Sequence, residues 1–371
     1  MQIIYGPGNG CYKVVADILS KHNACKVMIV CDQAYGFLPF KGFLDCLSVS
    51  IAKFSDFGSN PLYESVVKGV QLFKQENCDL IIAVGGGSAI DVAKCIKLYS
   101  QLPQDVNFLE QQLEDTKVPL IAIPTTAGTG SESTHYAVIY YEGEKQSITH
   151  DSILPDYVVL EPSVLASLPL FQKKCTMLDA LCQGIESWWS VNSTDESKEY
   201  SQKAVQLIVE NWEKYIFDND FEAAAKIMCA ANYAGRAINI TQTTAAHAMS
   251  YKITSLYRLP HGYAVALCLP RLWRFMADNA DKVVDGRGKG YLSIIFKDTA
   301  RSMGCNGIDE AIKYFEQMMG KLELPVIVSQ QNADDLKVLV SSVNPVRLRN
   351  NPVLLTEDDF EILYKEIVYE G

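Results

Sequence analysis

The chain has 371 residues, too many for one ordinary hydrophobic core, so two domains are expected. Apolar residues make up 48% and charged residues 21%, as is usual for a globular protein in water. A net charge of −11 without a run of Lys or Arg argues against nucleic acid or an anionic membrane as the main partner. No apolar segment approaches the roughly 20 residues of a spanning helix, and the start MQIIYGPGNG lacks signal-peptide features.

The eleven Cys are scattered along the chain, and no two form a CxxC pair. In a chain of this size, scattered thiols are typical of small core residues in a reducing compartment, not of disulfides or a zinc cluster. We therefore expect a cytoplasmic protein.

Strands and helices alternate in the first part of the chain. Apolar runs at 26–32, 78–84 and 118–123 are typical of buried parallel strands. Helical spacing occurs at 11–21 and from 62 to about 75, and a further helix begins at about Ala89. This alternation predicts a parallel α/β sheet.

A glycine triplet stands between the strand at 78–84 and the helix that follows it. Gly85, Gly86 and Gly87 allow a ligand to approach the backbone, and Ser88 leads into a helix whose first N–H groups can face an anion. The segment is neither a Walker loop nor the usual GxGxxG fingerprint. Its position between strand and helix nevertheless predicts a phosphate cradle.

A second loop rich in hydroxyls and glycines, Pro124 to Ser133, follows the strand at 118–123. The alternative interpretation is a surface linker. Two such loops at the carboxyl ends of parallel strands predict a dinucleotide at the edge of the sheet.

Asp32 ends the first long strand and is suited to the ribose hydroxyls of NAD. Its charge would repel the 2′-phosphate of NADP, so NAD is the preferred cofactor. The alternative interpretation of Asp32 is a helix N-cap.

From about Leu165 the periodicity is helical to the end of the chain. This pattern predicts a domain at 1–162 that binds NAD(P) and an all-α domain at 163–371. The expected helices are 176–190, 196–215, 220–238, 242–257, 263–277, 291–303, 308–320, 331–341 and 356–369.

Asp179 and Gln183 lie one turn apart on a predicted helix, and His247 and His261 flank an apolar segment further on. One acid and two imidazoles from separate helices could hold a divalent metal with a position left open. From the residues alone, the alternative is that Asp179 serves a helix terminus and the histidines are core residues.

These motifs, in this order and spacing, resemble the iron-containing (group III) alcohol dehydrogenase family over nearly the whole chain. The resemblance implies a Rossmann-like NAD(P) domain and an all-α domain that holds a metal (the dehydroquinate synthase-like fold), with the active site in the cleft between them. The segments that carry it are Gly85–Ser88 with Asp91 and Lys94, Pro124–Glu132, Asp179–Leu181 with Glu186, His247, Pro260–Gly262 and Asn350–Glu357.

The resemblance also implies residue roles. The glycine triplet with Ser88 would hold the pyrophosphate, and Asp179, His247 and His261 match three metal ligands. The further residues assigned to the cofactor are Asn60, Asp91, Thr125, Thr126, Thr129, Ser131 and Lys145.

Two positions depart from the family pattern. The usual fourth ligand, a His, is Gln183 here, and a further His is replaced by Tyr251. Gln183 could ligate through its amide oxygen, or the site could have three protein ligands and water. The expected metal is Fe2+ or Zn2+, and loss of the metal is the alternative.

The segments 179–194 and 236–251 resemble the branch of phosphonoacetaldehyde reductases, which implies reduction of phosphonoacetaldehyde to 2-hydroxyethylphosphonate. Arg236 and Lys252 are suited to a dianionic phosphonate. The alternative for Arg236 is an acid partner on a helix surface.

The expected reaction is hydride transfer from NAD(P)H to a small aldehyde. With the relay His replaced, the proton comes from solvent, from the ribose hydroxyls or from the Tyr251 phenol. The competing hypotheses are a generic aliphatic or polyol alcohol dehydrogenase, a lyase of the dehydroquinate synthase type, and a metal-free NAD-binding protein. The resemblance also implies a homodimer or a larger homo-oligomer.

Overall fold

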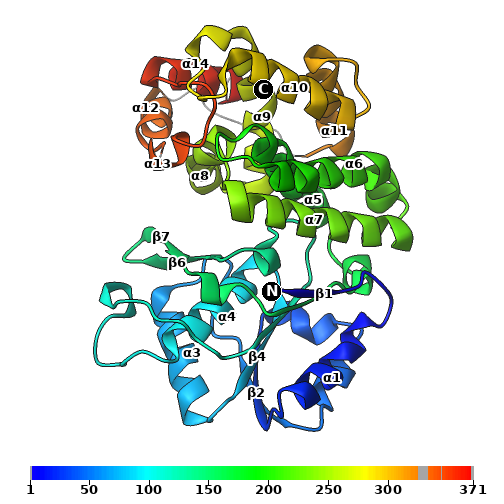
Figure 1. The fold of residues 1–371 in the computed structure, drawn as a ribbon, viewed down its shortest axis with the longest axis vertical. Helices are drawn as coiled ribbons and strands as arrows, with labels where there is room; N and C mark the ends of the chain where they lie inside the picture. The colour runs from blue at the N-terminus through cyan, green and yellow to red at the C-terminus, as the bar shows by residue number, and fades with distance from the viewer. Residues whose placement is uncertain (1, 325–332, 344, 369–371) are drawn as a thin grey trace. The chain divides into compact units, whose positions relative to one another are not determined.

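The computed structural model describes residues 2–324, 333–343 and 345–368 (Figure 1). The chain forms two compact units. The first contains Met1–Leu168 and Phe217–Gly235, and the second contains Pro169–Ile216 and Arg236–Gly371. The domain boundary predicted near residue 162 stays a prediction.

The first unit is built on a six-stranded sheet with the order β1-β8-β5-β4-β2-β3, in which every pair of neighbours is parallel. The central strands are buried on both faces, which explains their continuous apolar sequences. The strands are β1 (Ile3–Tyr5), β2 (Lys26–Cys31), β3 (Ser50–Phe54), β4 (Leu80–Gly85), β5 (Leu120–Pro124) and β8 (Tyr157–Val159).

Helices cover both faces of this sheet. Helices α3 and α4 lie on one face and α1 on the other, as Figure 1 shows. Right-handed crossovers give this arrangement for the observed strand order. The helices are α1 (Val14–Lys21), α2 (Lys41–Asp45), α3 (Tyr63–Gln75) and α4 (Gly87–Tyr99), with short 3-10 turns at η1 (Cys11–Lys13), η2 (Gln33–Phe37), η3 (Phe108–Glu110), η4 (Ser131–Ser133), η5 (Asp151–Ile153) and η6 (Pro162–Ala166).

A separate hairpin follows the loop after β5. Its strands are β6 (Tyr136–Tyr141) and β7 (Glu144–Thr149). Glu142 and Gly143 form the two-residue turn with φ of 51° and 80°, the positive values that a tight hairpin turn needs.

The second unit is entirely helical in the described residues apart from one isolated bridge, Val283 to Val353. No helix within the described ranges is both long and apolar enough to cross a membrane. Helices α6 and α7 run up to or across the division between the units. The helices from Leu170 onward are α5 (Leu170–Trp189), α6 (Asp195–Phe217), α7 (Phe221–Thr241), α8 (Ala245–Tyr257), α9 (His261–Asp278), α10 (Gly288–Ser302), α11 (Ile308–Leu322), α12 (Ala333–Ser341), α13 (Pro345–Leu348) and α14 (Glu357–Val368), with η7 (Ala280–Lys282) between α9 and α10.

The predicted fold class is confirmed, but several elements differ from the sequence prediction. Strands β1, β3 and β8 and the β6–β7 hairpin were not predicted. β1 and β8 have only three residues each, and β3, β6 and β7 have mixed exposure, so all five give little periodic signal. The start of the helix predicted at 331–341 and the last residue of the one predicted at 356–369 lie outside the described residues.

The connection between α7 and α8 explains why the helix predicted to start at 242 begins at Ala245. Gln242 has a φ of 56°, in the left-handed region, and Thr244 is also outside the helical region. Thr244 donates from its N–H and its hydroxyl to the Glu186 carboxylate, at 3.1 and 2.6 Å. A contact distant in sequence thus sets the helix start.

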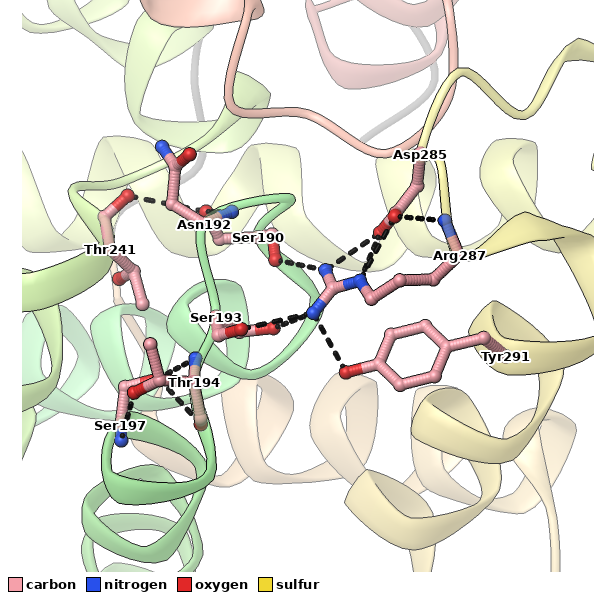
Figure 2. Close-up of polar contacts among 9 residues, drawn as sticks. All are labelled: Ser190, Asn192, Ser193, Thr194, Ser197, Thr241, Asp285, Arg287 and Tyr291. Carbon is pink, nitrogen blue, oxygen red and sulfur yellow. Dashed lines mark hydrogen bonds and ion pairs between the residues drawn. The ribbon is translucent and has the colours of Figure 1, made fainter.

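Arg287 binds the end of α5 to the segment before α10 (Figure 2). Its guanidinium donates to the carbonyl oxygens of Ser190 and Ser193 at 2.8 and 3.0 Å. Two of its nitrogens, Nε and Nη2, also form an ion pair with the buried carboxylate of Asp285, and the guanidinium lies against the Tyr291 ring. Because Ser190 is the C-cap of α5, this contact satisfies backbone acceptors at the end of that helix.

Replacing Arg287 by Ala should lower the free energy of unfolding by about 3 kcal/mol, because the buried Asp285 carboxylate would lose its cation. Urea denaturation followed by circular dichroism measures the effect. Arg301→Ala is the matched control, since Arg301 pairs with Asp298 in an exposed ion pair and should change stability by less than about 1 kcal/mol. Equal effects of the two substitutions would contradict the role given to Arg287.

Candidate functional site

The carboxyl ends of β2 and β4 form the topological switch point of the sheet. The chain leaves β2 toward β3 and leaves β4 toward β5, in opposite directions along the sheet. Ligands of open α/β sheets bind in the crevice at such a point. Asp32 follows β2, and Gly85 ends β4 with Gly86 and Gly87 directly after it, so both predicted elements lie there.

The glycine loop is in close contact with its neighbours. A Cβ on Gly85 would lie 2.6 Å from Cβ of Ala89 and 3.2 Å from Oδ2 of Asp32, and one on Gly87 would lie 3.0 Å from the Thr129 side chain. Gly86 is the N-cap of α4 and brings no side chain to the first N–H groups of that helix. The loop therefore leaves backbone donors for an anion, as the phosphate cradle requires.

The loop after β5 closes the other side of this region. The N–H of Thr125 donates to the carbonyl of Gly85 at 3.0 Å, and Thr126 lies 3.5 Å from where a Cβ of Gly86 would be. A Cβ on Gly130 would lie 2.4 Å from Cα of Gly235, so α7 packs directly on the loop. The predicted threonines thus adjoin the glycine triplet.

Asp91 and Ser131 lie behind this loop, in a buried polar cluster. The Asp91 carboxylate accepts from the Ser131 hydroxyl at 2.6 Å and from the N–H of Val138 at 2.9 Å. Buried Lys94 donates to the Ser131 carbonyl, and burial lowers its pKa to about 8. Burial raises the pKa of Asp91, and the charges of Lys94 and Lys145 oppose that rise. These bonds hold the loop in place; cofactor contact by Asp91, Ser131 and Lys145 stays a prediction.

Asn60, Ser88 and Asp32 complete the predicted cofactor set. The Ser88 hydroxyl donates to the carbonyl of Ser59 at 2.6 Å, which brings the exposed Asn60 segment to the start of α4. Oδ1 of Asp32 accepts from the N–H of Ala34 at 2.9 Å. This is the N-cap role considered as the alternative, and it leaves Oδ2 facing the glycine loop.

In the second unit, three predicted ligands from three helices converge. One ligand atom of each of Asp179 on α5, His247 on α8 and His261 at the start of α9 lies within 4.8 Å of the others. Oδ1 of Asp179 and Nε2 of His247 are 3.4 Å apart. Both atoms are buried, and neither has a hydrogen-bond partner in the part of the chain described. A buried carboxylate oxygen and a buried imidazole nitrogen that face one another without a partner fit a bound cation.

A close helix crossing positions His261. A Cβ on Gly262 would lie 2.1 Å from the Cys175 carbonyl oxygen and 2.7 Å from Cβ of Asp179. Only a glycine allows α9 to approach α5 this closely. The crossing sets the neighbouring His261 beside Asp179.

The charges of this group also suit a cation. Burial opposes ionisation of Asp179, but the nearby imidazoles of His247 and His261 lower the pKa of this carboxyl below its usual value. Burial would lower the pKa of His247, but the carboxylates of Glu186 and Asp179 raise it to about 10. Two buried carboxylates here have only imidazoles as ion-pair partners within the described ranges.

Glu186 is the site residue to which the sequence prediction gave no role. It is fully buried two turns after Asp179 on α5. One oxygen, Oε2, accepts a short hydrogen bond from Nδ1 of His247, and the other accepts from N–H groups at the start of α8. The sequence feature that could have indicated this role is an acid seven residues after Asp179, on nearly the same face of an apolar helix.

Gln183 and Tyr251, the two departures from the family pattern, both adjoin the ligand group. Gln183 is buried one turn after Asp179, and its hydrogen bond to that carboxyl helps to lower the pKa of Asp179. The ring of Tyr251 stacks on the imidazole of His261, with centroids 5.5 Å apart and an interplanar angle of 1°. Ligation by Gln183 stays a prediction.

Arg236 lies against Tyr200 of α6. The guanidinium sits 4.0 Å from the centroid of the Tyr200 ring and donates to its hydroxyl. Lys203 lowers the pKa of the nearby Glu199 carboxyl, and the charge of Arg236 adds to that effect. Within the described residues, no hydrogen bond or ion pair joins Arg236 to the ligand group, and Lys252 is a half-buried residue of α8. The alternative for Arg236 was an acid partner on a helix surface, whereas its hydrogen bond is to the Tyr200 phenol. Phosphonate binding by Arg236 and Lys252 stays a prediction.

Family models match both parts of the sequence. The model described as iron-containing alcohol dehydrogenase matches residues 2–162, and the model of the C-terminal part of the Fe-containing alcohol dehydrogenase family matches residues 174–368. The chain belongs to the iron-containing alcohol dehydrogenase family. The predicted family and the predicted enzyme class, an oxidoreductase of the alcohol dehydrogenase type, are confirmed.

Individual relatives of this chain differ in what they are named for. A phosphonoacetaldehyde reductase of Streptomyces viridochromogenes is 35% identical over 65% of this chain and 64% of the relative. Alcohol dehydrogenase 4 of Saccharomyces cerevisiae is 31% identical over 71% of this chain and 72% of the relative. A sulfoacetaldehyde reductase of Bifidobacterium kashiwanohense, solved with NAD+, has a TM-score of 0.89 at 24% identity and covers 100% of this chain and 98% of its own, which shows the shared fold.

Replacing Gly262 by Ala should lower the thermal midpoint and weaken Zn2+ binding by on the order of tenfold or more, since the new Cβ would push α9 and His261 away from α5. Differential scanning calorimetry and a chelator competition measure the two effects. Gly320→Ala, within α11 and with nothing within 4 Å of its added Cβ, is the control and should leave Zn2+ binding unchanged. Wild-type affinity in the Gly262 variant would disprove the positioning role of the crossing.

Proposed function

We propose that this chain is a metal-dependent oxidoreductase that reduces a small aldehyde to a primary alcohol with NAD(P)H. The observation that carries the proposal is the convergence of Asp179, His247 and His261 with unsatisfied buried acceptors, in a chain of this family. A lyase of the dehydroquinate synthase type and a metal-free binding protein are less consistent with this combination.

Asp179, His247 and His261 would hold the metal, with the Gln183 amide as a fourth ligand. One carboxylate and two imidazoles suit Fe2+ and Zn2+ equally well. A divalent ion held there supplies Lewis-acid stabilisation of charge on the substrate oxygen. Tyr251 keeps the His261 ring in a fixed plane and offers a phenol beside it; solvent and the ribose hydroxyls are the other proton sources.

The first unit would bind the dinucleotide at the switch point, with its pyrophosphate at the start of α4. The glycine loop and the loop at 124–130 would hold the cofactor, and its nicotinamide would supply the hydride. Asp32, with Oδ2 turned toward the glycine loop, favours NAD over NADP. We also propose that the protein is cytoplasmic and forms a homo-oligomer.

The favoured substrate is phosphonoacetaldehyde, because the relative of that name is 35% identical to this chain. The contacts of Arg236 with Tyr200 give no support to Arg236 as the phosphonate-binding residue. A simple aliphatic aldehyde or polyol substrate is the second candidate, since alcohol dehydrogenase 4 of yeast is 31% identical over a longer part of the chain.

An NADH-oxidation screen over matched aldehydes tests the substrate. We expect kcat/KM for phosphonoacetaldehyde to exceed that for acetaldehyde and propionaldehyde by about 100-fold or more, because recognition of a dianion by charged donors contributes several kcal/mol. Equal or higher values for the uncharged aldehydes would assign the chain to the second candidate. His247→Ala, which removes one predicted ligand, should have no turnover with any of them.

Replacing Asp32 by Asn should raise the ratio of kcat/KM with NADPH to kcat/KM with NADH by about tenfold, because a charge facing the 2′-phosphate is removed. The Asn side-chain oxygen can still accept from the N–H of Ala34, so the thermal midpoint should stay unchanged. Steady-state kinetics with both cofactors measures the ratio. An unchanged ratio would show that Asp32 serves only as an N-cap.

A further inference from the structure

Glu186 contacts two different parts of α8 with its two oxygens. Oε1 accepts from the N–H groups of Thr244, Ala246 and His247, at 3.1, 3.0 and 3.3 Å. Oε2 accepts from Nδ1 of His247. The same carboxylate thus accepts hydrogen bonds from the N–H groups at the start of α8 and from the His247 side chain in the first turn.

The bond to Nδ1 decides which nitrogen of His247 can bind a metal. An acceptor at Nδ1 keeps the proton on that nitrogen, so the lone pair of the neutral imidazole lies on Nε2. Nε2 is the atom that lies 3.4 Å from Oδ1 of Asp179. A carboxylate that fixes the tautomer also raises the basicity of the metal-binding nitrogen.

We propose that Glu186 is a positioning residue for the metal. It fixes His247 as the Nδ1–H tautomer, and the same carboxylate accepts hydrogen bonds from the N–H groups at the start of α8. Glu186 acts through His247 and is not itself among the three converging ligands. The inference rests on the metal site of the proposed function.

Glu186→Gln separates the two roles of the carboxylate. An amide has one acceptor oxygen and one NH2 group. The N–H donors at the start of α8 require the oxygen at the Oε1 position, so the NH2 group must face Nδ1 of His247. The variant should keep the helix start but reverse the tautomer, placing a proton on Nε2.

We expect the Zn2+ affinity of Glu186→Gln, measured by chelator competition, to fall about 10- to 100-fold while the circular dichroism spectrum of the metal-free protein is unchanged. Glu161→Gln is the matched control: Glu161 is also fully buried and accepts from the N–H groups of Gly10 and Ser163, within the first unit. It should bind Zn2+ like the wild type. Wild-type affinity in the Glu186 variant would overturn the proposal.

A second measurement does not depend on the folding of a variant. In the Zn2+-loaded wild type labelled with 15N-histidine, His247 should show a protected Nδ1–H proton in the NMR spectrum, and its absence would overturn the proposal. If the wild type binds no Zn2+ or Fe2+ at all, the proposed function fails. If it binds the metal but Glu186→Gln binds it equally well, only the positioning role fails.

Discussion

Two carboxylates are buried on helix α5 of the second unit and constrain how the neighbouring helices pack. Asp179 and Glu186 lie in the interior, and in the described part of the chain their ion-pair partners are imidazoles alone. Buried charges are costly unless they are paired and hydrogen-bonded. Helices α8 and α9 therefore have to bring His247 and His261 against α5, and the glycine at position 262 makes the second approach possible.

The first unit depends on a different constraint, the meeting of loops at the carboxyl ends of parallel strands. Gly85 to Gly87 can lie close to Asp32 and the threonine loop because β2, β4 and β5 are neighbours in the sheet. The polar cluster of Asp91, Lys94 and Ser131 then fixes the loop from behind. A rigid backbone cradle suits a ligand that is recognised by its phosphates.

Substrate recognition is the part of the function that residue type predicts least well. An Arg near the end of α7 is suited to a phosphonate by its chemistry, but its observed partner is the Tyr200 ring. The same guanidinium can bind a ligand or stabilise a helix pair, and only the direction of its side chain separates the two. Tyr251 is a similar case, since stacking on His261 gives it a role that its sequence position alone does not define.

The sequence by itself predicted the α/β and helical parts and the two loops, because apolar periodicity and turn residues are local signals. The acid and the two histidines of the ligand group were predicted from motifs whose order and spacing resemble the family. The tertiary structure decided what depends on contacts between distant segments. It supplied the short strands β1, β3 and β8, the start of α8 at Ala245 and the hydrogen bond of Glu186 to His247. The physical reason is that the role of a buried polar side chain depends on its hydrogen-bond partner. For Glu186 and for the start of α8, that partner lies far away in the sequence.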